Sequence, residues 1–287
     1  MDLKKIIFLG IRPKTLVAAL IPPLVVQGLI YKEFHIQDWY IILHCLGLGL
    51  FIQIATNFYN DAIDFKKGAD ENRVGPKRVS DEKTLKLVYR IGHISLFIAL
   101  LFGIPLVLKG GVIFLVLGAI SLYFSYGYTG GPFPLAYLGL GEVFVFLFFG
   151  LLATLGTYFL VMSNLSISSF VLACQMGFLS CALIAINNFR DRKTDILVGK
   201  KTLATKLSDF QFMKVIDLFL FGPYLFLLYF ILFIDLRFFF VLFAIRFAHI
   251  ARRTIHNYMN EVELNYALEN AGKHLLIFGL LFCLCCL

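Results

Sequence analysis

The chain has 287 residues, of which 60% are hydrophobic and only 15% are charged, and its mean hydropathy is +0.84. A soluble protein of this length needs far more polar surface, so the composition excludes a soluble domain and predicts an all-α polytopic membrane protein. The formal net charge of +8 lies mostly between apolar segments. There it suits anionic lipid head groups or an anionic substrate, and we expect no nucleic-acid partner.

About nine apolar segments have the length of membrane-spanning helices, the eighth being short. In chain order we expect them at residues 15–31, 39–57, 87–108, 110–127, 137–162, 168–188, 213–233, 237–250 and 271–287. No removable signal peptide is expected, because the N-terminus has no long apolar core followed by small residues. We interpret residues 1–287 as one membrane-embedded domain, and its six cysteines, all inside apolar runs, as structural.

Lysine and arginine are distributed unevenly between the loops. With the N-terminus placed in the cytoplasm, 22 of them fall on the cytoplasmic side and 3 on the other, with Arg246 inside the eighth segment. Positively charged loops remain in the cytoplasm. The asymmetry therefore predicts a cytoplasmic N-terminus and a C-terminus on the opposite side of the membrane.

Two polar stretches, residues 58–86 and 189–212, follow the second and sixth segments and are expected to be cytoplasmic loops that carry aspartates. Their similar spacing resembles a weak internal duplication, with four helices per unit and the ninth left over. Steps of three and four residues put side chains on one face of a helix. The polar residues so spaced are Asn57, Asn60, Asp61 and Asp64 in the first stretch, and Asn187, Asn188, Asp191 and Asp195 in the second.

Carboxylates gathered on two faces repel each other unless a cation lies between them. Oxygen ligands select a hard cation, so the pattern predicts Mg²⁺, which completes its shell with substrate phosphates and water. Basic residues flank both stretches and would bind phosphate oxygens. The predicted metal ligands are Asp61, Asp64, Asp191, Asp195 and Asn57, and the predicted phosphate-binding residues include Arg12, Lys14, Lys77, Arg78, Arg190, Lys200 and Lys201.

A diphosphate site at the membrane face, opening into an apolar bundle, suits a lipid diphosphate. Loss of diphosphate leaves an allylic cation, which aromatic faces stabilise. Tyr126 and Tyr128 stand where a helix enters a cytoplasmic loop, so both are candidates to line the site. Glu142 is either part of the site or an interfacial carboxylate, and the sequence leaves these alternatives open.

These residues carry a family likeness. The paired stretches NDAIDFKKGAD and NNFRDRKTDILVGKKTLA resemble the two aspartate motifs of the UbiA-type membrane prenyltransferase superfamily. The stretches IRPKTL, GPKR and YTGGP resemble its 1,4-dihydroxy-2-naphthoate polyprenyltransferase branch, which serves menaquinone biosynthesis. The resemblance runs in order over nearly the whole chain.

The resemblance implies a nine-helix bundle in a bacterial inner membrane, with a central cavity capped on its cytoplasmic side. It implies Mg²⁺-dependent transfer of a polyprenyl chain from polyprenyl diphosphate to 1,4-dihydroxy-2-naphthoate, with loss of carbon dioxide and diphosphate. Asp61, Asp64, Asp191 and Asp195 would be the catalytic, metal-binding residues. Where the superfamily often has a third aspartate this chain has Gly68, and the branch suggests that Asp70 takes its place as a metal ligand.

Three other functions compete with this interpretation. A related prenyltransferase would use another aromatic acceptor, such as 4-hydroxybenzoate. A CDP-alcohol phosphotransferase would need a dense acidic motif that does not occur in the sequence. A cation-coupled transporter would carry its acids near the middle of the bilayer, whereas here they cluster at the ends of apolar segments.

Overall fold

The computed structural model describes residues 3–68 and 78–287, and all the regular elements in these ranges are helical. The elements are α1 (Leu3–Ile11), α2 (Pro13–Phe34), α3 (Trp39–Lys66), α4 (Glu82–Gly110), α5 (Val112–Gly127), α6 (Leu135–Leu138), α7 (Gly141–Val145), the π-helical η1 (Phe146–Leu152), α8 (Ala153–Met162), α9 (Ile167–Leu197), α10 (Leu203–Lys206), α11 (Asp209–Phe233), the 3₁₀-helical η2 (Leu236–Ala244), α12 (Ile245–Asn257) and α13 (Leu264–Cys286).

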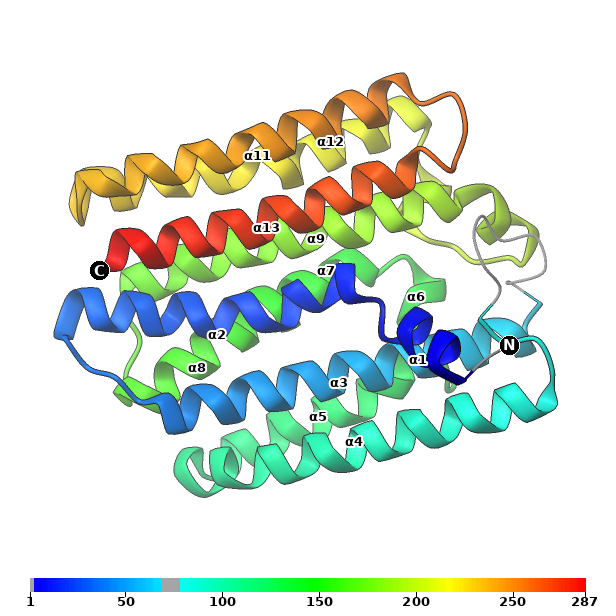
Figure 1. Cartoon of the computed structure of the whole chain (residues 1–287), viewed down its shortest axis with the longest axis horizontal. Coiled ribbons are helices and arrows are strands. Elements are labelled where there is room, and N and C mark those ends of the chain that lie inside the picture. Colours follow the sequence, from blue (N-terminus) through cyan, green and yellow to red (C-terminus); the bar gives the residue numbers. More distant parts are fainter. Residues whose placement is uncertain (1–2, 69–77) are drawn as a thin grey trace.

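The long helices lie side by side along one direction and form a bundle (Figure 1). α3 packs against α4, α2 against α13, and α9 against α11. The two chain termini lie at opposite ends of the bundle. The C-terminal ends of α3 and α9 lie at the end that also holds α1 and α6, and we call this the acidic end.

Short polar side chains begin the long helices. The Asp38 carboxylate accepts the backbone N–H of Ile41 at the start of α3, and Asp81 accepts that of Thr84 at the start of α4. Such caps satisfy backbone donors that the first helical turn leaves unpaired. Ser166 and Ser208 form capping boxes at the starts of α9 and α11. The sequence thus sets the point where each of these helices enters the bundle.

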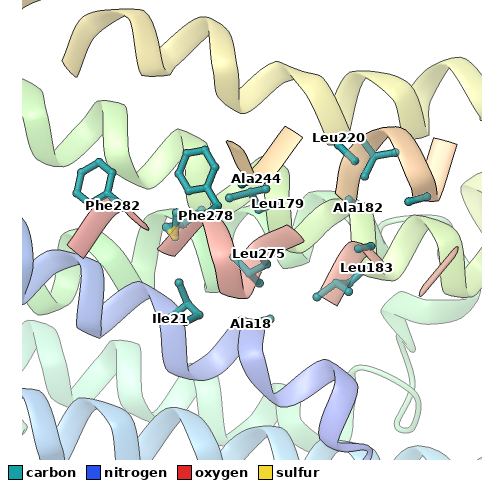
Figure 2. Close-up of a cluster of buried hydrophobic side chains, with 14 of the residues drawn as sticks. Ala18, Ile21, Leu179, Ala182, Leu183, Leu220, Ala244, Leu275, Phe278 and Phe282 are labelled. Atoms are coloured by element: carbon teal, nitrogen blue, oxygen red, sulfur yellow. The ribbon is translucent and has the colours of Figure 1, made fainter. Parts of the chain in front are cut away.

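The main apolar core lies where α2, α9, α11 and α13 meet (Figure 2). Its large side chains, such as Leu275, Phe278 and Phe282, are fully buried. Small residues let the helices approach closely, as in other membrane bundles. For example, a Cβ added to Gly150 of η1 would lie 2.5 Å from the Cα of Gly177 of α9. This packing holds α9 in the middle of the bundle, and α9 contributes Asp191 and Asp195 to the acidic end.

The outer helices present apolar side chains outward, such as Leu108, Leu225, Phe233 and Phe243. Within the described residues, seven helices are long and apolar enough to cross a membrane, and α5 is a shorter apolar helix of 16 residues. The expected polytopic helical membrane fold is confirmed. The number of nine spans stays a prediction, because the eighth segment is built from η2 and α12, of which α12 carries a polar face.

The expected loops at residues 58–86 and 189–212 begin later than predicted. α3 continues as a helix to Lys66 and α9 to Leu197, so the aspartates lie in the last helical turns. The same three- and four-residue spacing that predicted their common faces also continues the helices into the polar stretches.

Candidate active site

Asn57, Asp61 and Asp64 lie on one face of α3 near its C-terminal end, and all three side chains are buried. The Asn57 amide donates to the backbone carbonyl of Ile11 at 2.9 Å, and its oxygen accepts from Gln53 at 3.1 Å. Asn57 therefore ties α3 to the junction of α1 and α2. This contact places the next residue of the junction, an arginine, beside the aspartates.

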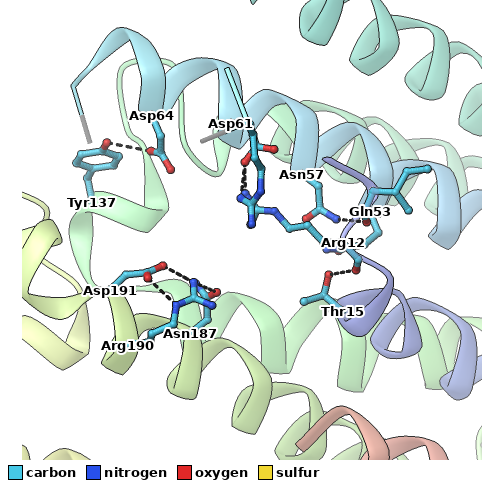
Figure 3. Close-up of polar contacts among 12 residues, drawn as sticks. Arg12, Thr15, Gln53, Asn57, Asp61, Asp64, Tyr137, Asn187, Arg190 and Asp191 are labelled. Carbon is cyan, nitrogen blue, oxygen red and sulfur yellow. Dashed lines mark hydrogen bonds and ion pairs between the residues drawn. The ribbon is translucent and has the colours of Figure 1, made fainter. Parts of the chain in front are cut away.

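Arg12 occupies that junction with a left-handed backbone, at a φ of 53°. A residue other than glycine is disfavoured in the left-handed backbone region by about 1 to 2 kcal/mol. Residues with such strained backbones are enriched in functional sites. The Arg12 guanidinium donates to the Asp61 carboxylate (Figure 3). Arg78 donates to the same Asp61 oxygen at 2.8 Å. Two guanidinium groups thus converge on one buried carboxylate.

The end of α9 faces these residues across the site (Figure 3). Arg190 forms a forked ion pair with Asp191, with both N–O distances 2.7 Å. It also donates to the Asn187 oxygen at 2.9 Å and to Asn265, at the start of α13, at 3.0 Å. Because these contacts use four donor–acceptor links, Arg190 is held firmly and joins α9 to α13.

Tyr137 of α6 lies between the two acidic helices. Its hydroxyl donates to Asp64 at 3.3 Å. The Lys67 ammonium lies 3.7 Å from the centre of its ring, and the Lys200 ammonium lies 5.6 Å from it. Lys200 also pairs with Asp195 at 3.3 Å. The Tyr137 ring therefore lies against Lys67 and Lys200 in the region between α3 and α9.

The pKa values of Lys67 and Lys200 are shifted in opposite directions. Burial lowers the pKa of Lys67, although the Asp64 carboxylate works in the opposite direction. Burial also opposes the charge of Lys200, but the carboxylates of Asp64, Asp195 and Asp191 outweigh it and raise its pKa. Lys200 therefore keeps its charge to a higher pH than an ordinary lysine, and Lys67, whose side chain is largely exposed, loses its charge at a lower pH.

Glu142 and Tyr128 lie behind the aspartates. Glu142, on α7, is buried and accepts from the Asn188 amide of α9 at 2.9 Å. Burial and the charges of Glu142, Asp195 and Asp64 raise the pKa of Tyr128. The Tyr128 hydroxyl lies beside Gly141, next to Glu142 in the chain, and the Glu142 carboxylate is buried against α9.

Several predicted residues are placed differently. Lys14 pairs with Glu269 of α13 at 2.7 Å and not with the aspartates. Tyr126 is exposed and packs edge-on against the Tyr59 ring. The Lys201 side chain is also exposed, although its backbone N–H donates to Tyr137. Asp70 and Lys77 lie outside the described residues. Tyr137 was missed by the sequence reasoning, since nothing marks one aromatic residue among 13 tyrosines.

The oxygen donors of the site suit Mg²⁺ in their chemistry. Among residues 3–68 and 78–287, no three His, Cys, Asp or Glu side chains are gathered closely enough to hold a metal. The buried Asp195 Oδ2 and Asn60 Oδ1 atoms nevertheless have no hydrogen-bond partner in the described part of the chain. These orphaned acceptors fit a bound cation.

A pocket of about 360 Å³ lies at the other end of α3, between its start and α4. It is lined by Asp38, Tyr40, Ile41, Pro105, Leu108 and Lys109. The length of α3, at 1.5 Å per residue, separates it from the aspartates. The central cavity implied by the family resemblance stays a prediction.

The structure is a helical membrane bundle with acidic and basic side chains gathered at one end, as in an integral membrane enzyme that acts on a charged group at the membrane face. A family model described as the UbiA prenyltransferase family matches residues 19–263. The chain belongs to the UbiA prenyltransferase family, and it is therefore a transferase enzyme embedded in the membrane.

Individual relatives agree with this family. A 1,4-dihydroxy-2-naphthoate octaprenyltransferase of Mycobacterium tuberculosis is 35% identical over 202 residues, covering 70% of this chain and 69% of the relative. The enzyme of the same name from Escherichia coli is 34% identical over 209 residues, covering 70% and 68%. UbiA prenyltransferase domain-containing protein 1 of Danio rerio is 30% identical over 227 residues, covering 76% and 66%.

A solved structure of a digeranylgeranylglyceryl phosphate synthase matches with a TM-score of 0.60, covering 100% of this chain and 99% of the other. At 17% sequence identity this likeness concerns the fold alone. The order of the helices along the whole chain is therefore that of a known membrane fold.

Proposed function

We propose that this enzyme transfers a polyprenyl chain from polyprenyl diphosphate to 1,4-dihydroxy-2-naphthoate, with loss of carbon dioxide and diphosphate, to give the quinol form of a demethylmenaquinone. The observation that carries the diphosphate half is the convergence of Arg12 and Arg78 on Asp61, opposite the Arg190–Asp191 pair. The acceptor half is supported by relatives named for that acceptor at 32% to 35% identity.

The basic residues have distinct roles in this proposal. Arg12 and Arg78 offer forked donors, which match phosphate oxygens in pairs. Lys67 and Lys200 add point charges from the side of Tyr137. Together they bind and orient the diphosphate, so that the first carbon of the prenyl chain points toward the apolar bundle.

The family generally depends on a divalent metal, and we propose Mg²⁺ here. Asp64 and Asp195 would hold it, with Asp61 and Asp191 released by their arginines when the substrate binds. The bound ion would neutralise the charge that develops on the departing diphosphate. The side chains themselves keep the acids at fixed positions on two rigid helices.

The proposed orientation places the acidic end and the N-terminus in the cytoplasm of a bacterium, and the C-terminus across the inner membrane. The support is the asymmetry of lysine and arginine between the loops and the position of the termini at opposite ends of the bundle (Figure 1). Reporter fusions to both termini test it.

The decisive assay supplies polyprenyl diphosphate and 1,4-dihydroxy-2-naphthoate to purified enzyme in the presence of Mg²⁺ and measures carbon dioxide and prenylated product. Asp61→Asn should reduce turnover at least 100-fold. The matched control is Asp217→Asn. Asp217 lies on α11 and pairs with Arg252 and His256 of α12, outside the site. If the wild type prenylates 4-hydroxybenzoate instead, the acceptor is wrong. If Asp61→Asn keeps full activity, the diphosphate site is wrong.

A further inference from the structure

One carboxylate near the site is not used by the diphosphate chemistry. Glu142 is only 4% exposed, and its Oε1 atom accepts from the Asn188 amide at 2.9 Å. Its Oε2 atom is also buried and has no hydrogen-bond partner within the described part of the chain. A buried carboxylate oxygen without a donor is costly, so the position calls for a ligand that brings a donor.

The surrounding helices hold Glu142 in place. The Cys181 thiol of α9 donates to the Glu142 backbone carbonyl at 3.1 Å. Asn188, two turns further along the same helix, donates to the Glu142 side chain. Asn188 lies one turn before Asp191 and two turns before Asp195. α9 thus carries both the acids of the diphosphate site and the donor that orients Glu142.

Tyr128 connects the two regions. A Cβ added to Gly141 would lie 2.9 Å from the Tyr128 hydroxyl and 3.8 Å from the Asn188 amide nitrogen. Glycine at position 141 therefore leaves space that the hydroxyl occupies. Within the described part of the chain, the titratable groups beside Glu142 include this hydroxyl and the Cys181 thiol, and the carboxylates of Asp195 and Asp64 also act on Tyr128.

We infer that Glu142 binds a ring hydroxyl of the aromatic acceptor and serves as the general base that activates the ring. This inference rests on the proposed function, since it requires a hydroxylated aromatic acceptor. The free Oε2 atom meets the donor that such a hydroxyl supplies. Asn188 and Tyr128 act as positioning residues, because the Asn188 amide orients the carboxylate and the Tyr128 hydroxyl lies beside Gly141, next to Glu142 in the chain.

The proposed step balances. The hydroxyl proton passes to Glu142 while electron density from the ring oxygen moves into the ring. The ring carbon that carries the carboxylate forms a bond to the first prenyl carbon, and the bond from that carbon to the diphosphate oxygen breaks, leaving its electron pair on diphosphate. Carbon dioxide then departs and its electron pair restores the aromatic ring. The ring oxygen recovers the proton from Glu142.

The test is Glu142→Gln, which keeps the shape and the contact with Asn188 but cannot accept the proton. General-base catalysis contributes 10²- to 10⁴-fold, so we expect kcat to fall at least 100-fold at neutral pH. The affinity for inorganic diphosphate with Mg²⁺ should remain within twofold, which also shows that the variant is folded.

The readout specific to a base is the pH profile. In Glu142→Gln the rate should rise about tenfold per pH unit below the pKa of the ring hydroxyl, because the ionised acceptor needs no base. Electron-poor acceptors with more acidic hydroxyls should restore activity at neutral pH. Glu142→Asp, which keeps a carboxylate, should retain a measurable rate without that pH dependence.

Two outcomes overturn the inference. One is a kcat for Glu142→Gln within threefold of the wild type. The other is a loss in Glu142→Gln that neither pH nor acceptor acidity changes, which marks a structural role. If the wild type rejects 1,4-dihydroxy-2-naphthoate, the proposed function fails instead. The same series with the hydroxylated aromatic that it does accept then tests Glu142 separately.

Discussion

Tyr137 allows its two contacts to be separated by substitution. Tyr137→Phe removes the hydroxyl that donates to Asp64 at 3.3 Å but keeps the ring beside Lys67 and Lys200. Hydrogen bonds to charged groups contribute about 1.5 to 3 kcal/mol, and the long distance places this one at the lower end. We therefore expect about a tenfold loss of affinity for Mg²⁺-diphosphate, since 1.4 kcal/mol is tenfold.

Tyr137→Leu removes the ring as well. The Lys67 contact at 3.7 Å is the closer of two cation–π interactions, and such contacts contribute about 0.5 to 2 kcal/mol each. We expect a further three- to thirtyfold loss relative to the phenylalanine variant. The loss should appear in diphosphate affinity and in KM for the prenyl diphosphate, whereas KM for the acceptor should not change.

Titration calorimetry with inorganic diphosphate in excess Mg²⁺ measures both variants. Tyr40→Phe is a suitable control, because Tyr40 is exposed at the opposite end of α3. Equal affinities of wild type, Tyr137→Phe and Tyr137→Leu would refute the reasoning that this ring organises the lysines of the site.

Three further predictions concern the same end of the bundle. Arg12→Gly and Arg12→Ala should lose diphosphate affinity equally, but Arg12→Gly should be more stable by about 1 to 2 kcal/mol, because only glycine relieves the left-handed backbone; thermal unfolding of the pair checks this, and equal melting temperatures would contradict it. Because burial lowers the pKa of Lys67, this lysine loses its charge at a lower pH than an ordinary lysine, so diphosphate affinity should begin to fall on the alkaline side earlier in the wild type than in Lys67→Arg; identical pH profiles would exclude a role for Lys67. Chelation of divalent cations should abolish turnover and added Mg²⁺ should restore it, whereas activity that survives chelation would exclude a metal.

The sequence predicted the membrane fold and the elements of the site, but it did not predict their contacts. Three- and four-residue steps placed Asp61 and Asp64 on one face, and the structure has that face on α3. The pairing of Arg12 with Asp61 joins residues 49 positions apart, and no local pattern records it. Local spacing is visible in a sequence because it follows helix geometry.

The misplaced residues show the same limit. Lys14 lies only two positions from Arg12, but α2 begins between them and turns Lys14 toward Glu269. Tyr126 and Tyr128 are likewise two positions apart at the end of α5, but Tyr126 packs on Tyr59 whereas the Tyr128 hydroxyl lies beside Gly141. Proximity in sequence to a motif therefore does not establish a place in the site.

The pairing of acids with bases at the acidic end has a consequence for ligand binding. Asp61, Asp191 and Asp195 are each neutralised by a cation of the chain itself. A metal arriving alone would have to displace lysine from Asp195 or arginine from Asp61 and Asp191, and a diphosphate arriving alone would have to draw the same basic side chains from their carboxylates. When both arrive, the metal binds the carboxylates of the broken ion pairs and the diphosphate binds the basic side chains. The two ligands should therefore bind with positive thermodynamic coupling, and each should raise the affinity for the other by the same factor.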